Sequence, residues 1–244
     1  MMNLLIDIGN TRLKWGMVED HRIIAGQPLV HHQVTRHELL NIWEKISPPQ
    51  RIAVACVSAK QLFEQVRLAA LELWPGVDMI SVNSQAQAFG VRNAYENPEK
   101  LGVDRWLSLV AARHCYPGAA CVIDCGTAIT VDVLDASGRH LGGLIGPGLM
   151  LMKKSLSFGT EQLQFSEADH AFGLAANTEA AIHSGTLSAA AGLIEHVVAR
   201  QPKNMQVILT GGDAKLVAEQ LVFKPIIDAD IVLRGLSIIL KSNE

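Results

Sequence analysis

The sequence predicts an α/β fold made of two similar lobes, each containing a mixed sheet. The main observation is an internal repeat, in which the apolar run that ends at Asp7-Ile8-Gly9 is echoed by the run that ends at Asp124-Cys125-Gly126. The two aspartates stand about half of the 244-residue chain apart. Each copy continues into a second strand-like run, a polar turn and a third run. We therefore expect lobes at residues 1–117 and 118–244, each of ordinary domain size.

Hydrophobic patterns predict the elements of the first lobe in the order βββαβαβ. Three short strands occupy the first thirty or so residues. Thr35 is a candidate cap for a helix at 35–46, which Pro48-Pro49 ends. The remaining elements are a buried strand at 51–57, an amphipathic helix at 58–74, a strand at 77–82, a loop at 90–102 and a helix at 104–116.

The second lobe has a similar pattern. Three strands are predicted between residues 120 and 145, and Gly146-Pro147-Gly148 turns the chain into a helix that ends near Leu156. Residues 157–176 show weak periodicity and read as an exposed segment. The elements after this segment are a long helix at 178–199, a strand at 205–209, a helix at 213–222, a short strand at 225–227 and a closing helix at 231–240.

Composition and charge exclude several classes of function. The net charge is −3 and no run of Lys or Arg is present, so we expect no nucleic-acid partner. No apolar run approaches the roughly 18 residues of a membrane-spanning helix, and the N-terminus lacks the pattern of a signal peptide. The four cysteines have no Cys-x-x-Cys spacing and lie in or beside apolar segments, which favours buried, reduced thiols in a cytoplasmic protein. The nine histidines are scattered; they favour solvated loop positions over a zinc site.

The repeated Asp-x-Gly turn predicts phosphate chemistry. Asp7 follows a strand and could hold Mg²⁺ against a nucleotide phosphate, although a turn-forming aspartate is the alternative. Gly9 lets the backbone approach a phosphate closely, and Asn10 and Thr11 can donate hydrogen bonds to it. Lys14 could reach the same oxygens or be solvated. If the lobes face each other, both turns serve one cleft. The P-loop pattern is absent.

Four motifs together make the chain resemble the type III pantothenate kinases, the family that includes the Bvg accessory factor proteins. The motifs are Asp7-Ile8-Gly9-Asn10-Thr11, Gly102-Val103-Asp104-Arg105, the segment from Asp124 to Asp132, and the segment from Gly142 to Gly148. They span nearly the whole chain. The resemblance implies a duplicated ribonuclease-H-like fold of the actin-like ATPases, and ATP-dependent phosphorylation of pantothenate to 4'-phosphopantothenate, the first step of coenzyme A biosynthesis.

The resemblance also assigns roles to particular residues. Asp104 is the expected catalytic base, although a helix-capping role also fits it. The implied ATP-binding residues are Asp7, Ile8, Gly9, Asn10, Thr11, Arg12, Leu13, Lys14 and Thr127. The implied pantothenate-binding residues are Tyr95, Gly102, Val103, Asp104, Arg105 and Thr178, of which Tyr95 could instead be a surface residue and Thr178 a helix cap.

Two further expectations concern ions and assembly. By resemblance, Asp124 belongs to a site for K⁺ or NH₄⁺ beside the ATP phosphates, and Asp7 holds Mg²⁺. Asp132 and Thr130 are as well explained by structural roles as by functional ones, and Gly211-Gly212 would let adenosine lie against the backbone. The resemblance implies a homodimer whose pantothenate pocket lies at or near the subunit interface. The small residues of the helix at 178–199 and the apolar surface of Trp106 and Leu107 favour such a dimer, although the small residues could instead pack only within the lobe.

Two other functions remain open on the sequence. One is a non-enzymatic transcriptional accessory factor on the same scaffold, which would not require the base Asp104. The other is a polyphosphate- or nucleotide-hydrolysing enzyme, in which water replaces the alcohol as acceptor. The fold alone does not distinguish these functions.

Overall fold

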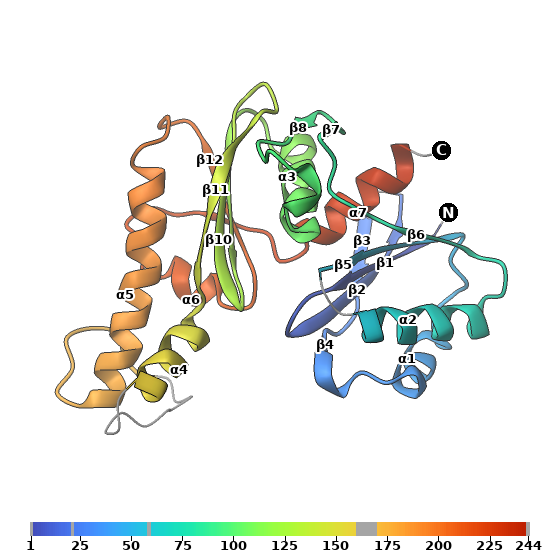
Figure 1. The fold of residues 1–244 in the computed structure, drawn as a ribbon, viewed down its shortest axis with the longest axis horizontal. Coiled ribbons are helices and arrows are strands. Elements are labelled where there is room, and N and C mark those ends of the chain that lie inside the picture. Colours follow the sequence, from blue (N-terminus) through green and yellow to red (C-terminus); the bar gives the residue numbers. More distant parts are fainter. Residues whose placement is uncertain (1, 21, 58–59, 160–169, 243–244) are drawn as a thin grey trace. The chain divides into compact units, whose positions relative to one another are not determined.

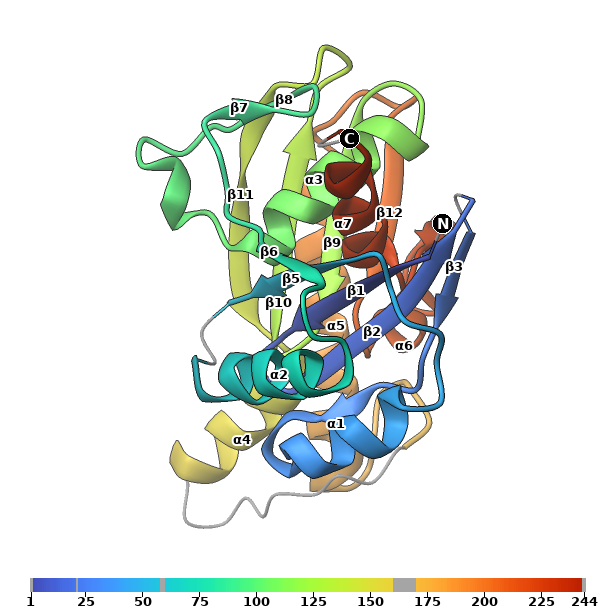
Figure 2. The same cartoon turned by 90° about the vertical axis from the view of Figure 1, so that its right-hand side faces the viewer.

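The computed structural model describes residues 2–20, 22–57, 60–159 and 170–242. The chain forms two compact units: the first joins Met1–Cys115 to Asp230–Glu244, and the second is Tyr116–Ala229. Each unit contains a mixed sheet with helices packed on it (Figures 1 and 2). Within the described ranges, no helix combines the length and apolarity that a membrane crossing needs.

The sheet of the first unit is organised around its first strand. Its strands are β1 (Asn3–Ile8), β2 (Arg12–Glu19), β3 (Arg22–Ala25), β4 (Leu29–Val30), β5 (Arg51–Cys56) and β6 (Asp78–Ser81). The order is β3-β2-β1-β5-β6, and β4 pairs with β2. β1 is antiparallel to β2 and parallel to β5. Every residue of β1 is buried, as expected for a strand covered on both faces.

Helices cover both faces of this sheet (Figure 2). On one face, α1 (Arg36–Trp43) and α2 (Lys60–Leu73) enclose a core in which Trp43 packs against Trp15 and Trp74. On the other face, α7 (Ile231–Ser242) packs against β1, β5 and α3 (Val103–Cys115). The shorter elements are η1 (His31–Gln33), β7 (Gln87–Ala88), β8 (Val91–Arg92) and η2 (Pro98–Lys100).

The sheet of the second unit repeats the strand order of the first. Its strands are β9 (Ala120–Cys125), β10 (Ala128–Leu134), β11 (His140–Pro147), β12 (Gln206–Thr210) and β13 (Ile226–Ile227), in the order β11-β10-β9-β12-β13. β9 is antiparallel to β10 and parallel to β12, so it occupies the position that β1 has in the first unit. The duplicated, ribonuclease-H-like arrangement predicted from the repeat is therefore confirmed.

Three helices pack on one face of the second sheet: α4 (Leu149–Gly159), α5 (Thr178–Val198) and α6 (Ala214–Ala218) (Figure 1). Their apolar side chains join those of alternate strand positions, such as Ile123 and Ile129, in one core. The small residues of α5 lie partly in this core, where Ala190 and Ala191 are buried.

Several predicted elements differ from the structure in detail. The cap at Thr35 is confirmed, because its hydroxyl accepts a hydrogen bond from the amide of Glu38 at 3.2 Å. The segment 90–102 contains β8 and η2 as well as loop, and β8 pairs with β7. α6 ends at Ala218 instead of 222, since the following residues turn back and Leu221 and Phe223 pack on the core. Of the exposed segment 157–176, residues 160–169 lie outside the described ranges.

The closing helix belongs to the first compact unit and not to the second. α3 and α7 follow corresponding strands of the two repeats, and they pack against each other in the first unit. The lobes expected at 1–117 and 118–244 divide the chain by its duplicated segments, and this division stays a prediction. The compact units have other bounds, because α7 buries its apolar face on β1, β5 and α3.

We expect Gly235→Ala to destabilise the protein, because α7 approaches α3 closely at this glycine. A Cβ at Gly235 would overlap the backbone of Leu107. Overpacking of this kind costs about 1–3 kcal/mol, which chemical denaturation measures. Gly192→Ala is the matched control on α5, since a Cβ there meets nothing within 4 Å. It should be neutral or stabilise by up to about 1 kcal/mol. Equal effects of the two substitutions would contradict this account of the α3–α7 contact.

Candidate active site

The first Asp-x-Gly turn joins the ends of β1 and β2. Asp7 is 7% exposed and is registered opposite Lys14, so the carboxylate and ammonium groups lie on the same face of the hairpin. The amide of Gly9 donates to the carbonyl of Arg12 at 3.0 Å and closes the turn. A Cβ at Gly9 would lie 3.2 Å from that carbonyl oxygen. The geometry of the turn itself therefore favours glycine at this position.

The predicted nucleotide-binding stretch divides into buried and exposed residues. Ile8 and Leu13 face each other across the hairpin and are both 0% exposed. Their side chains belong to the core, so they can serve a ligand only through their backbone. Asn10, Thr11 and Arg12 are exposed at the tip of the turn, where their polar groups can meet a phosphate.

His31 fixes this turn from outside the motif. Its Nδ1 lies 2.7 Å from the carbonyl oxygen of Gly9, and its amide donates to the carbonyl of Thr11 at 2.9 Å. The sequence prediction placed the histidines in solvated loops and therefore missed this role. No sequence signal identifies it, because both bonds go to backbone atoms that only the folded chain brings together.

The predicted catalytic residue lies at the start of α3. Asp104 is the second residue of this helix, and its Oδ1 accepts a hydrogen bond from the amide of Arg105 at 2.8 Å. Asp104 therefore does not occupy the cap position itself, although its carboxylate stabilises the first turn. A Cβ at Gly102 would come within 2.5 Å of Oδ1. Gly102 thus leaves the space that the Asp104 carboxylate occupies.

Arg105 and Tyr95, both predicted from the resemblance, lie together beside Asp104. Arg105 is only 6% exposed, and its guanidinium donates to the Tyr95 hydroxyl at 2.7 Å. The guanidinium carbon also lies 5.5 Å from the centre of the tyrosine ring, a distance suited to a cation–π contact. Tyr95 is therefore not a solvated surface residue. Val103 is 8% exposed and points its side chain into the core.

A loop residue that the sequence prediction did not single out holds Tyr95 in place. The side chain of Asn93 accepts a hydrogen bond from the amide of Tyr95 at 3.0 Å and donates to the carbonyls of Gln85 and Pro98, each at 3.2 Å. The loop that carries Tyr95 is thus tied to two other segments through a single amide. Such asparagines are common in loops, so the residue type alone gave no indication of this role.

The second Asp-x-Gly turn has the same hairpin but tighter packing. Asp124 is the last residue but one of β9, and a Cβ at Gly126 would lie 3.2 Å from its Oδ1. Gly211, with φ of 95°, crosses directly over the same carboxylate, and a Cβ there would overlap it. The first glycine of Thr210-Gly211-Gly212 thus has a local packing requirement. Thr127 is exposed in the turn.

Asp132 has a structural partner. Its Oδ1 lies 2.9 Å from Nε2 of His140, and the two residues are 2% and 1% exposed. A buried carboxylate is costly without such a hydrogen bond. This pair accounts for Asp132 by structure, and His140 is not the solvated histidine that the sequence suggested.

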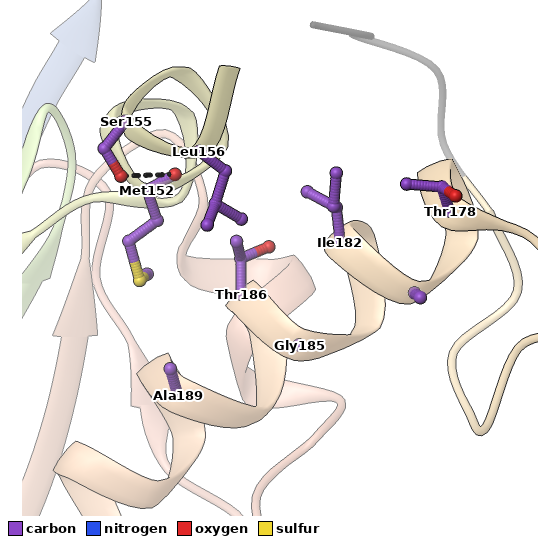
Figure 3. Close-up of a pocket in the computed structure, with 9 residues that line it drawn as sticks. Met152, Ser155, Leu156, Thr178, Ile182, Gly185, Thr186 and Ala189 are labelled. Atoms are coloured by element: carbon purple, nitrogen blue, oxygen red, sulfur yellow. Dashed lines mark hydrogen bonds between the residues drawn. The ribbon is translucent and has the colours of Figure 1, made fainter. Parts of the chain in front are cut away.

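Thr178 lies in the wall of a hollow of about 570 Å³ in the second unit (Figure 3). The hollow lies between α4, which contributes Met152 and Leu156, and the first half of α5, which contributes Ile182 and Thr186. Its size suits a small molecule or a side chain. Thr178 is not the cap of α5, because Asn177 accepts the hydrogen bond from the amide of Ala180 at 2.9 Å.

The predicted site residues offer single carboxylates and hydroxyls. Within the described parts of the chain, no three His, Cys, Asp or Glu side chains gather to hold a metal ion. A metal held by one carboxylate, completed by water and phosphate oxygens, is the usual way in which proteins bind Mg²⁺. Asp7 and Asp124, each at the end of a central strand, provide single carboxylates of this kind.

Comparison with solved structures supports the fold. The chain superposes on a protein described as a Baf-family transcriptional activator from Campylobacter jejuni with a TM-score of 0.60 and 24% identity over 98% of each chain. It also superposes on the ethanolamine utilization protein EutJ from Carboxydothermus hydrogenoformans with a TM-score of 0.57 and 12% identity, covering 98% of this chain and 89% of the other. At these identities the likeness concerns the fold.

Two sheets of the same order, each with an Asp-x-Gly turn at the end of its central strand, define the actin-like class of ribonuclease-H-like proteins. The family described as type III pantothenate kinase matches residues 3–200. A type III pantothenate kinase of Nitrosococcus oceani is 40% identical, over 99% of this chain and 95% of the relative. One of Aromatoleum aromaticum is 37% identical over 99% of both chains. The chain belongs to the type III pantothenate kinase family.

We expect the thiols of Cys121 and Cys125 to resist alkylation in the folded protein. Burial, with Asp132 nearby for Cys121 and with Asp124 and Asp213 nearby for Cys125, raises the pKa of each thiol to about 12. At pH 8 iodoacetamide should therefore modify the exposed Cys115 first, and mass spectrometry of digests identifies the sites. Cys115 also corrects the expectation that all four thiols are buried. Equal labelling of Cys115 and Cys125 would contradict the prediction.

The same thiols give a stability test in alkaline solution. Their folded pKa lies above the ordinary value of 9.0, so the unfolded chain releases these protons first. Their contribution to stability is therefore complete below pH 9 and is lost as the pH rises towards 12. A Cys121→Ala/Cys125→Ala variant should show a shallower decline of the unfolding free energy over this range.

Proposed function

We propose that this chain transfers the γ-phosphoryl group of ATP to the hydroxyl of pantothenate, giving 4'-phosphopantothenate in the cytoplasm, as the first step of coenzyme A biosynthesis. The observation that carries the proposal is the group formed by Asp104, Arg105 and Tyr95 at the start of α3, in a member of this kinase family. These are the residue types that an alcohol substrate with a carboxylate requires: a proton acceptor, a cation and a hydroxyl.

Asp104 is the base in this proposal. Phosphoryl transfer requires positioning and charge neutralisation more than covalent help, and a carboxylate accepts the proton of the attacking hydroxyl. The hydrogen bond from the Arg105 amide holds the carboxylate at the start of the helix. Gly102, which has no side chain, leaves room for this carboxylate beside the backbone. The guanidinium of Arg105, held by the Tyr95 hydroxyl, is suited to bind the carboxylate of pantothenate.

The Asp7 turn binds the phosphates of ATP with a divalent metal. Family membership implies ATP and a divalent metal, and the proposal assigns Mg²⁺ to the Asp7 carboxylate. Mg²⁺ supplies neutralisation of phosphate charge when bound. Lys14, registered beside Asp7, adds a second positive charge. The exposed Asn10, Thr11 and Arg12 donate hydrogen bonds to phosphate oxygens, while Ile8 and Leu13 contribute only their backbone.

The Asp124 turn binds a monovalent cation, K⁺ or NH₄⁺, and Thr127 contacts phosphate. Support comes from the oxygen atoms around Asp124: its carboxylate and the backbone carbonyl of Cys125 both lie against Gly211, and Thr210 is registered beside Asp124 on β12. A single carboxylate balances a single positive charge. Such a cation offsets the repulsion between the carboxylates of the site and a triphosphate.

The accessory-factor alternative is less well supported by the site. A protein that only binds would not need a carboxylate in the position of Asp104, with Gly102 leaving space for it. The name of the Campylobacter jejuni structure belongs to a protein that shares 24% identity, which carries the fold alone. The hydrolase alternative differs only in its acceptor, so a test of the acceptor separates it from the kinase.

We expect Asp104→Asn to lower kcat by roughly 10²-fold or more, because the amide cannot accept the proton. ATP consumption is measured with and without pantothenate, and circular dichroism checks the fold. Glu99→Gln is the matched control, since Glu99 is an exposed acid nearby in η2. Near-normal turnover of Asp104→Asn would exclude Asp104 as the base. ATP consumption independent of pantothenate in the wild type would favour the hydrolase.

The proposal includes a homodimer, but on different grounds from those the sequence suggested. Trp106 and Leu107 are both 0% exposed, so they offer no apolar surface for a partner. The support comes from β11 and the adjoining α4, which expose Leu144, Ile145, Met150, Leu151 and Leu156. Exposed apolar side chains in consecutive elements are typical of interaction surfaces. Thr178, in the hollow against α4, is proposed as a further pantothenate contact in this dimer.

We expect light scattering to give a mass twice the 26.4 kDa of one chain, with the surface of β11 and α4 at the interface. Leu144→Glu should place a charge in this surface and shift the protein towards monomer on dilution. Leu71→Glu is the matched control, because Leu71 is 54% exposed on α2 of the first unit. A wild-type monomer that phosphorylates pantothenate at full rate would refute the dimer.

A further inference from the structure

The sheet of the second unit carries a row of polar side chains on one face. The parallel pairing of β12 with β9 registers Thr210 with Asp124, and the antiparallel pairing of β9 with β10 registers Asp124 with Thr130. Registered residues of neighbouring strands place their side chains on the same face, one strand spacing apart. The alternate positions, such as Ile123 and Leu209, face the core beneath α5 and α6. Thr210 and Asp124 are thus side-chain neighbours.

Thr210 has an unexplained hydroxyl. The residue is 1% exposed, and among the residues that the structure describes its Oγ1 has no hydrogen-bond partner. A buried hydroxyl that lacks a partner is destabilising, and in a native protein it requires an explanation. Valine has nearly the same shape and favours strands, so packing alone does not account for threonine at this position.

The backbone around this hydroxyl is shaped to Asp124. Directly after Thr210 the chain turns at Gly211, which has a φ of 95° and crosses over the Asp124 carboxylate so closely that a Cβ would overlap it. Gly126 closes the other side, with a would-be Cβ at 3.2 Å from Oδ1. Two glycines therefore enclose one carboxylate, and the Thr210 hydroxyl adjoins it on the neighbouring strand.

The donors gathered here are oxygen atoms. The set comprises a carboxylate, a hydroxyl and the backbone carbonyl of Cys125, which also lies against Gly211. Alkali cations take oxygen ligands, and neutral oxygens serve K⁺ well. The thiol of Cys125 does not compete, because its side chain lies in the core on the other face.

We propose that Thr210 Oγ1 is a second side-chain ligand, beside Asp124, of the monovalent cation. The inference rests on the proposed assignment of that cation to Asp124. The hydroxyl oxygen donates a lone pair to the cation, and this interaction satisfies the buried group for which the described residues offer no hydrogen-bond partner. Thr210 then contributes to the affinity for K⁺ without adding charge, which preserves the balance of one carboxylate and one cation.

The test measures cation binding through thermal unfolding, apart from turnover. Wild type, Thr210→Val, Thr210→Ser and Asp124→Ala are titrated with KCl or NaCl at constant ionic strength, with Mg²⁺ and a non-hydrolysable ATP analogue present. A ligand that binds only the folded state raises the Tm with its concentration. Thr186→Val is the matched control, since Thr186 is a buried threonine on α5 whose hydroxyl donates to the His183 carbonyl.

We expect KCl to raise the Tm of the wild type, and Thr210→Val to shift the KCl midpoint at least about tenfold higher, the loss expected for one good ligand. Thr210→Ser keeps the hydroxyl and should stay within about threefold of the wild type, as should Thr186→Val. Without K⁺, the Tm of Thr210→Val should be at least as high as that of the wild type, because valine buries no hydroxyl.

The outcomes separate the inference from its premise. If Thr210→Val has the same KCl midpoint as the wild type, the role of Thr210 is overturned and the Asp124 assignment stands. No difference between KCl and NaCl in the wild type, or a normal response in Asp124→Ala, would overturn the cation assignment and the inference together. If Thr210→Val does not fold, a KCl midpoint in Thr210→Ala equal to that of the wild type would likewise overturn the role of Thr210.

Discussion

The pairing of the central strand in each unit determines where the functional groups lie. β1 and β9 are each antiparallel to the strand that follows them and parallel to a strand far along the chain. Hydrogen bonding on both edges leaves no polar backbone exposed, so such a strand can be buried on both faces. The chain leaves the sheet at the last residues of this strand. At this end, a carboxylate on an otherwise buried strand can reach a ligand. Asp7 and Asp124 both occupy this position.

Glycines next to these carboxylates set how closely the backbone can approach them. Gly102, Gly126 and Gly211 each have a would-be Cβ within 3.2 Å of an aspartate oxygen or in overlap with it. The aspartates concerned are the proposed base and the proposed cation ligand. Each motif therefore combines an aspartate with a glycine whose backbone lies close to the carboxylate. This close contact accounts for the glycines even without a ligand.

The sequence predicted the duplicated sheets, because these depend on local signals: apolar periodicity, turn residues and an internal repeat. Its assignment of residues to the candidate site stays a prediction. The sequence could not predict features that depend on which distant strands pair. His31 contacts backbone carbonyls, His140 meets Asp132 across a hairpin, and Thr210 meets Asp124 across a parallel pair. Nor could it predict that Trp106 is fully buried. An apolar residue on a helix gives the same sequence pattern whether it packs inside the protein or against a partner.

The return of α7 to the first unit also fixes an order of assembly on the ribosome. The second unit is continuous in sequence, Tyr116–Ala229, so all of it is available before α7 is synthesised. The first unit has segments on both sides of the second, and the helix that packs against β1, β5 and α3 is synthesised after the whole of the second unit. Contacts between such distant segments form slowly, because a long loop must close first. The part of the protein that carries Asp7 and Asp104 is therefore completed only after α7 has been synthesised, and a chain that stops before α7 leaves one face of that sheet without its cover.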